Sequence, residues 1–193
     1  AGSEWRGSHP PKHIVTNTTT DPPPRMHEIR FEALHADVLP PARATAHSAG
    51  YDLRAWFAQD RHDVWSGAEV EARPLDGAPG SYVLTLGPLE RSVIPLGFRA
   101  TLPPGVEGQI RARSGLALKK GLIVPNAPGT IDPDYTGEWG VLVLNASSTP
   151  LTISHGERIA QLILAHFVSL PFVAGPVVPT TERAGGFGST GAH

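Results

Sequence analysis

The stretch Arg183–Gly191 gathers residue types that handle triphosphates: an arginine, a run of glycines, and the adjacent hydroxyls of Ser189 and Thr190. Phe187 is the single aromatic side chain among these glycines. Because a glycine-rich tail cannot build a core of its own, something outside the chain's own fold must order it. The composition indicates that a nucleotide orders the tail. The alternative interpretation is an unstructured terminal segment.

Two phosphate-binding motifs do not explain this tail. Gly186–Gly191 has the spacing GxGxxG, but a dinucleotide fingerprint needs a following helix and an acidic residue about 20 positions further on. The sequence ends at His193, so neither follows. A Walker loop requires a lysine after the glycines, and none is present. Arg183 and Phe187 keep a nucleotide-binding interpretation open.

Carboxylates that could activate water lie in the segment Gly129–Gly137. Asp132 and Asp134 stand there among glycine and proline, which predicts a tight hairpin. Such aspartates often only form the turn, and that alternative stays open. The segment follows Pro125 and Asn126 and precedes an apolar strand. A polar loop held by rigid strands is how sites are commonly presented.

Three further positions carry polar chemistry. Ser114 and Gly115 open a short predicted helix, where backbone N–H groups and a hydroxyl could bind an anion and Arg113 could add a charge-assisted hydrogen bond. The alternative is that Ser114 only caps the helix. Asp52 lies between two residues suited to burial, and a buried carboxylate needs a partner or a metal. Gln161 interrupts an apolar strand, so its amide also needs a partner.

The elements that must position these residues are mostly strands. Short apolar runs separated by glycine and proline predict an all-β sandwich or barrel. We expect strands near residues 29–33, 83–86, 91–94, 98–102, 106–112, 122–124, 139–144, 151–153 and 159–164. One short helix is expected from Gly115 to Lys120. Residues 56–81 fit this rhythm poorly and contain Asp-Gly and Pro-Gly turns.

The composition narrows the function classes. The chain has 193 residues, 40% of them apolar, and a net charge of −2, so bulk electrostatics favour neither nucleic acid nor membrane as a partner. It has no cysteine, which excludes disulfides and thiolate chemistry and fits a reducing, cytoplasmic compartment. Its nine histidines show no zinc-binding spacing.

Five segments, taken in order, resemble the five motifs of the trimeric dUTP diphosphatase (dUTPase) family. They are Ala49–Leu53, Arg113–Ala117, Asn126–Glu138, Gly156–Ile163 and Arg183–Gly191. The resemblance implies an all-β fold of the distorted jelly-roll or β-barrel-like type, with one short helix. It also implies a homotrimer with sites shared between subunits, and hydrolysis of dUTP to dUMP and pyrophosphate. That reaction would keep uracil out of DNA and supply dUMP for dTMP synthesis.

The resemblance also implies a role for each site residue. Asp132 would be the general base that activates water for attack on the α-phosphate, and Asp52 would orient water bound to Mg²⁺, which the substrate phosphates otherwise hold. On the nucleoside side, Asn126 and the backbone at Thr130 and Ile131 would read the uracil edge, and Tyr135 would pack on the deoxyribose. The expected phosphate ligands are Arg113, Ser114, Gly115, Gln161, Arg183, Ser189 and Thr190. Phe187 would stack over uracil when the tail closes as a lid over a neighbouring subunit's site.

The predicted organisation has three parts. Residues 1–24 are expected to be a disordered extension, residues 25–178 the β domain, and residues 179–193 the flexible lid. Three departures from the family pattern stand out. The spacing between Arg183 and Phe187 is one residue short, and the N-terminal extension lies outside the pattern. Residues 56–81 are an insertion, expected as a surface hairpin, with a role over the site or in a contact as the alternative.

Two competing functions remain to be distinguished. A dCTP deaminase shares the implied fold, but that family carries Arg-Ser-Ser where this chain has Arg113–Gly115, and it lacks the segment that bears Asp132. The other alternative is a non-catalytic protein that senses nucleotides. The presence of all five motifs argues against decay of the site.

Overall fold

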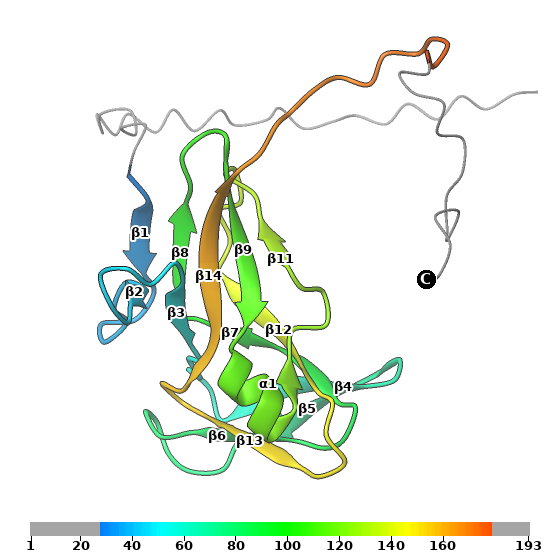
Figure 1. The fold of residues 1–193 in the computed structure, drawn as a ribbon. Coiled ribbons are helices and arrows are strands. Elements are labelled where there is room, and N and C mark those ends of the chain that lie inside the picture. Colours follow the sequence, from blue (N-terminus) through cyan, green and yellow to red (C-terminus); the bar gives the residue numbers. More distant parts are fainter. Residues whose placement is uncertain (1–27, 179–193) are drawn as a thin grey trace, which may run out of the picture.

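The computed structural model describes residues 28–178 of the chain (Figure 1). Its elements, in chain order, are β1 (Arg30–Ala33), β2 (Ala42–Arg43), β3 (Tyr51–Arg54), β4 (Arg61–Ser66), β5 (Glu69–Pro74), β6 (Val83–Leu86), β7 (Arg91–Pro95), β8 (Phe98–Thr101), β9 (Val106–Ala112), α1 (Ser114–Lys120), β10 (Leu122–Ile123), β11 (Gly129–Ile131), β12 (Gly140–Asn145), β13 (Leu151–Ser154) and β14 (Arg158–His166). The prediction of a mostly β chain with one short helix is confirmed.

Two five-stranded sheets carry most of the structure. One has the order β10-β12-β7-β4-β5 and the other the order β11-β9-β14-β3-β2, while β1-β8 and β6-β13 form two short pairs. The pairings between these strands are antiparallel. In β12, the buried residues Val141 and Val143 alternate with half-buried ones, so one face of this strand packs on the core.

Trp139 anchors the core just before β12. Its side chain is 1% exposed, and its indole Nε1 donates a hydrogen bond to the carbonyl oxygen of Ala100 at 3.1 Å. Its ring centroid lies 5.4 Å from that of Phe98, which in turn contacts Phe31. Burying a large apolar side chain stabilises a fold by about 1.5–3 kcal/mol. This cluster therefore ties the chain leading into β12 to the β1-β8 pair.

The segment Gly129–Gly137 is not the predicted tight hairpin. Its first three residues form β11, which pairs with β9, whereas the following strand β12 pairs with β7 and β10. The segment therefore crosses from one sheet to the other. Glycine and proline correctly signalled a turn, but turn chemistry does not determine which sheet each flanking strand joins.

The insertion at residues 56–81 contains a regular hairpin, as expected. Strands β4 and β5 pair from Arg61 opposite Pro74 to Ser66 opposite Glu69, and β4 joins β7 where Trp65 lies opposite Arg91. The insertion thus extends one sheet by two strands. The sequence did not predict the bounds of the two strands, because β5 has no apolar alternation and its residues are mostly exposed.

An ion pair fastens this hairpin to the body of the domain. Arg73 donates two hydrogen bonds to the carboxylate of Glu90, at 2.5 and 2.8 Å, and one to the carbonyl oxygen of Thr85 at 3.0 Å. The same carboxylate accepts the backbone N–H of Gly87 at 2.6 Å. The hydrogen bonds from Arg73 lower the pKa of Glu90 below its ordinary value. The Arg73–Glu90 pair therefore holds β5 beside the turn before β7.

After β14 the chain leaves the body of the domain (Figure 1). Residues 167–178 form no strand, and their large apolar side chains are exposed, with Val168 at 82% and Phe172 fully open to solvent. An exposed apolar stretch of this kind marks an interaction site. In the part of the chain that the structure describes, no helix is long and apolar enough to cross a membrane.

Candidate functional site

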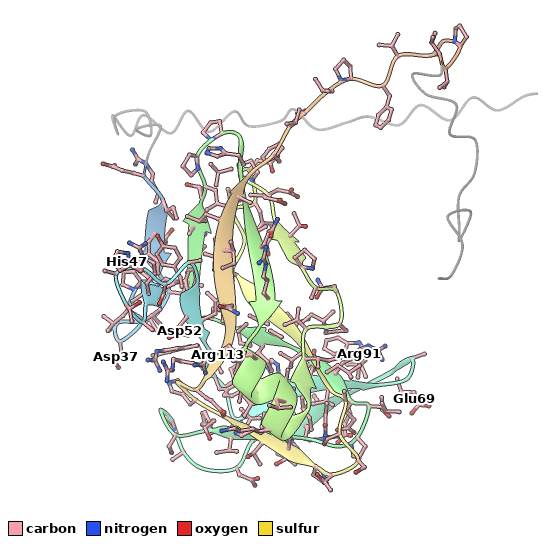
Figure 2. The ribbon with its side chains drawn as sticks, in the orientation of Figure 1. Asp37, His47, Asp52, Glu69, Arg91 and Arg113 are labelled. Atoms are coloured by element: carbon pink, nitrogen blue, oxygen red, sulfur yellow. The ribbon has the colours of Figure 1, made fainter. Side chains whose placement is uncertain are left out.

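A cavity of about 760 Å³ lies where β3, β14 and the start of α1 meet. Among its lining residues are five that the sequence singled out: Asp52, Arg113, Ser114, Gly115 and Gln161. The sheet register brings them together, because Gln161 lies opposite Asp52 on one side and opposite Arg111 on the other. Figure 2 shows Asp52 and Arg113 side by side near the start of α1.

Asp52 has the ionic partners that its burial requires. Its side chain is 19% exposed, and its two oxygens lie 3.4 Å from Arg113 Nε and 3.0 Å from Arg158 Nη1. Arg113 also donates from Nη1 to the carbonyl oxygen of Arg158 at 2.9 Å. Asp52 therefore orients two guanidinium groups, that of Arg113, which lines this cavity, and that of Arg158, which lines the adjoining one. No role was predicted for Arg158, although it lies within the segment Gly156–Ile163.

The start of α1 presents a hydroxyl that the helix itself does not use. The capping position is Arg113, with φ −84° and ψ 124°, and no side chain caps the helix. Ser114 is the first helical residue, so the alternative that it serves as the N-cap is wrong. Ser114 and Gly115 are both exposed. A Cβ atom added at Gly115 would meet nothing within 4 Å, so this side of the cavity is open.

The amide of Gln161 is held in one orientation. Its Nε2 donates to the carbonyl oxygen of Ala112 at 3.0 Å, which supplies the partner that the sequence required. A Cβ atom at Gly50 would lie 2.6 Å from Gln161 Oε1, so only glycine allows this close approach. Gly50 thereby leaves room for the amide oxygen at the cavity wall.

The charges around this cavity favour an anion. Four cationic side chains line it, Arg111, Arg113, Lys119 and Lys120, against the single carboxylate of Asp52. Asp52 is itself paired with two arginines, so the balance stays positive. Arginine and lysine together with a hydroxyl form a typical phosphate-binding set.

A second cavity, of about 360 Å³, holds most of the residues predicted on the nucleoside side. Thr130, Ile131, Asp132 and Tyr135 all line it. The hydroxyl of Tyr135 donates to the carbonyl oxygen of Glu138 at 3.0 Å, and its backbone N–H bonds the carbonyl oxygen of Asp132 at 3.1 Å. These two bonds close the turn that presents the exposed carboxylate of Asp132.

Asn126 does not line this second cavity. It is exposed and lies against Gly129, where an added Cβ atom would be 3.2 Å from Asn126 Nδ2. The intervening Ala127–Pro128 peptide bond is cis. Asn126 is therefore next to β11, on the same segment as the other predicted residues of the nucleoside side.

One chain does not bring the two cavities together. Ile131 lies opposite Gly108, five residues before Arg113. At about 3.4 Å per residue, about 17 Å of strand separates Ile131, the residue before Asp132, from the arginine that lines the first cavity. Asp132 and Arg113 of one chain are therefore too far apart to act on the same bond.

The remaining predicted site residues are Arg183, Phe187, Ser189 and Thr190, and they lie outside the described residues. Between residues 28 and 178, no group of three or more His, Asp or Glu side chains is arranged to hold a metal ion. With both oxygens facing arginines, Asp52 suits contact with a metal-bound water better than direct ligation.

Comparison with known proteins gives one consistent family. A sequence model described as dUTPase matches residues 80–191. The deoxyuridine 5'-triphosphate nucleotidohydrolase of Methylocella silvestris is 48% identical over 158 residues, which cover 81% of this chain and 86% of that protein.

Solved structures agree on the fold. A dUTPase variant of Staphylococcus bacteriophage 80alpha, solved with dUpNHpp, matches with a TM-score of 0.66 at 22% identity, covering 86% of this chain and 99% of that one. The dUTPase of phage phi11 of S. aureus matches with a TM-score of 0.61 at 19% identity, covering 80% and 99%. The predicted fold of the jelly-roll type is confirmed by these likenesses.

Proposed function

The chain belongs to the dUTPase family of dUTP diphosphatases, and on that premise we propose that it hydrolyses dUTP at sites that neighbouring subunits build together. The observation that carries the proposal is the division of the predicted residues between two cavities. Asp52, Arg113, Ser114 and Gln161 line one, and Asp132 and Tyr135 line the other. The cationic cavity would take the triphosphate of the nucleotide, and the cavity around Asp132 would take its nucleoside half.

The proposed reaction breaks the bond between the α-phosphorus and the oxygen bridging to the β-phosphorus. A water oxygen attacks the α-phosphorus, Asp132 accepts the proton of that water, and pyrophosphate leaves with the bridging oxygen. A positioned general base contributes about 10²–10⁴-fold to such a step. Arg113, and Arg158 through its pairing with Asp52, would offset the negative charge that builds up on the phosphates.

Magnesium is the expected cofactor, and the residues present fit it. Asp52 would hold a metal-bound water, and the substrate phosphates would supply the direct ligands. When bound, the ion would neutralise phosphate charge. One structural neighbour, the dUTPase of phage phi11, is described with a structural Mg(II) ion. Because Asp52 is fixed by two arginines, its oxygens are oriented before substrate arrives.

A homotrimer is the proposed assembly, as in the family that the sequence resembles. The exposed apolar residues 167–178 lead from β14 towards the segment that carries Arg183 and Phe187. Such an arm, packed on a neighbouring copy, would bury its apolar side chains and deliver the tail to that copy's site. Deleting residues 183–193 should then leave the fold intact and remove most of the activity.

The test of the chemistry uses two neighbouring carboxylates. Pyrophosphate release is measured with Mg²⁺ from dUTP, dCTP, dTTP and UTP, for the parent, Asp132→Asn and the control Asp134→Asn. We expect turnover of dUTP alone, a loss of about 10²–10⁴-fold in Asp132→Asn, and near-parent activity in Asp134→Asn. Ammonia release from dCTP would instead support a deaminase, and equal losses in both variants would remove the special role of Asp132.

The test of the shared site mixes two inactive chains. Asp132→Asn and Arg113→Gln are unfolded together, refolded together and assayed. If each site joins the two cavities from different subunits, random assembly restores about a quarter of the sites. If each site lies within one chain, mixing restores nothing.

A further inference from the structure

The inserted hairpin has an apolar face that its own chain leaves partly open. Val64 of β4 is buried on the face that packs on the core, so its neighbour Trp65 points to the opposite, outer face. Trp65 lies directly opposite Val70 of β5, and Val70 is 56% exposed. Side chains directly opposite each other in an antiparallel pair are in contact. Trp65 and Val70 therefore form an apolar pair on the outer face of the hairpin.

This pair continues an apolar face that crosses the whole sheet. The register places Trp65 opposite Arg91 of β7, and Arg91 opposite Leu144 of β12. Leu144 in turn lies opposite Ile123 of β10. Val93, two residues after Arg91, is on the same face and is 46% exposed. A contiguous apolar face of this kind marks an interaction site.

Val93 connects this face with the site. It lines the cavity around Asp132, which in the proposed function works with the cationic cavity of another chain. A second copy must therefore approach Val93. Trp65 is a diagonal neighbour of Val93 across the β4–β7 pair, and such neighbours are about 7–8 Å apart. A copy that covers Val93 is thus within side-chain reach of the hairpin.

The charge of the insertion fits the part of the second copy that carries the cationic cavity. Residues 56–81 contain more carboxylates than guanidinium groups, namely Asp60, Asp63, Glu69, Glu71 and Asp76 against Arg61 and Arg73. Opposite charges on two surfaces orient their encounter. Helix α1, beside the cationic cavity, also lacks cover from its own chain, because none of its residues is buried and Leu118 is 85% exposed.

Contacts with the body of the domain hold the hairpin in place. Arg91 donates a hydrogen bond from Nη2 to the carbonyl oxygen of Gly67 in the turn, and Figure 2 shows Arg91 beside the end of the hairpin that carries Glu69. On the other strand, the Arg73–Glu90 pair fastens β5. A surface that is fixed before docking loses less conformational entropy when a partner binds.

We propose that the outer face of the inserted hairpin, carried by Trp65 and Val70, is a contact surface for a second copy of this chain, which meets it with the part that carries the cationic cavity. This inference rests on the proposed function, because it assumes sites shared between chains. Two different faces of one chain meet in such a contact, and a contact of this kind can close into a ring. The insertion thereby helps to hold together the copies that share a site.

The first test uses the absence of cysteine from the chain. Val70→Cys and Glu71→Cys place a single thiol on the outer and on the opposite face of β5, and the two side chains are similarly exposed in one chain, at 56% and 66%. In the assembled protein, a maleimide should label Val70→Cys at least about 10-fold more slowly than Glu71→Cys, because only the first thiol lies in the contact. After dissociation in urea, the two rates should become equal. Equal rates in the assembled protein would overturn the inference.

The second test perturbs the contact itself. Val70→Glu should raise the dissociation constant of the assembly at least about 10-fold, because it buries a charge in an apolar contact. The matched control Glu71→Gln should stay within about 2-fold of the parent, as expected for an exposed charge. Sedimentation over a series of dilutions and urea concentrations measures both, and circular dichroism checks that the variants are folded. A folded Val70→Glu that assembles as tightly as the parent would also overturn the inference.

The inference and the proposed function fail on different results. An active, assembled parent with equal labelling at the two thiols overturns the inference alone. An assembled parent with a protected thiol at position 70 that does not hydrolyse dUTP overturns the proposed function alone. A parent that stays a monomer at every concentration overturns both the contact and the shared site.

Discussion

The Arg73–Glu90 pair should be the main fastening of the inserted hairpin, and Glu90→Gln tests this directly. The two side chains are 23% and 15% exposed, so the pair is largely withdrawn from water. One oxygen of Glu90 accepts bonds from Arg73 and Gly87, and the other accepts the second bond from Arg73. In glutamine, an NH₂ group replaces one of these oxygens, so at least one bond to Arg73 is lost together with the charge.

We expect Glu90→Gln to lower the free energy of unfolding by about 2–4 kcal/mol, from the loss of a charged hydrogen bond in a mostly buried pair. For a chain of this size, that is a fall in Tm of about 5–15 °C. The chain offers a matched control, because Arg73 also contacts Glu71 at 3.4 Å and Glu71 is 66% exposed. An exposed pair of this kind contributes about 0–1 kcal/mol, so Glu71→Gln should stay within about 3 °C of the parent.

The assay is thermal unfolding followed by circular dichroism at one protein concentration, repeated across pH. The pKa of Glu90 is lowered in the folded state, so its contribution is present above the ordinary pKa of glutamate and is lost as pH falls through the folded-state value. The gap in Tm between parent and Glu90→Gln should therefore narrow on acidification. Equal losses in Glu71→Gln and Glu90→Gln, or a gap that widens in acid, would refute the reasoning.

Three further predictions concern the two cavities. Gly115→Ala should not lower the parent's Tm, because the new methyl group meets no protein atom and alanine favours the helix, yet it should raise KM for dUTP several-fold by filling space proposed for phosphate, as steady-state kinetics would show. Asp52→Asn should leave Arg113 and Arg158 without their carboxylate and raise the Mg²⁺ concentration needed for half-maximal rate; an unchanged Mg²⁺ titration would contradict this. Because burial lowers the pKa of His62, the parent should lose stability as pH falls below about 6.5, and His62→Gln should lose less over the same range in parallel Tm measurements.

The sequence predicts the strands that a run of apolar residues marks. β12 is a continuous apolar run and β14 an apolar run interrupted by Gln161, and both lie where the pattern places them. β3 and β11 are short and partly polar, and β5 exposes most of its residues, so no periodic signal marks any of them. Their pairing depends on neighbours that are distant in the chain.

The same distinction holds for the site. The need of Asp52 for a partner could be predicted from its apolar neighbours, but Arg158 as that partner could not. The two residues are 106 positions apart, and only the register of β3 against β14 brings them together. No local feature marks His62 either, since it reaches the second cavity only because β4 joins β7.

The composition of strand β5 protects this protein against aggregation through an exposed sheet edge. Because the insertion adds two strands, β5 becomes the outer edge of its sheet, and an edge strand exposes backbone groups that can pair with another molecule. β5 carries Glu69, Glu71 and Arg73 at alternate positions and ends on Pro74, which has no N–H to donate. Charges and a terminal proline are devices that blunt such edges against aggregation. The insertion therefore creates an exposed sheet edge and also supplies the charged residues and the proline that keep this edge from pairing with another molecule.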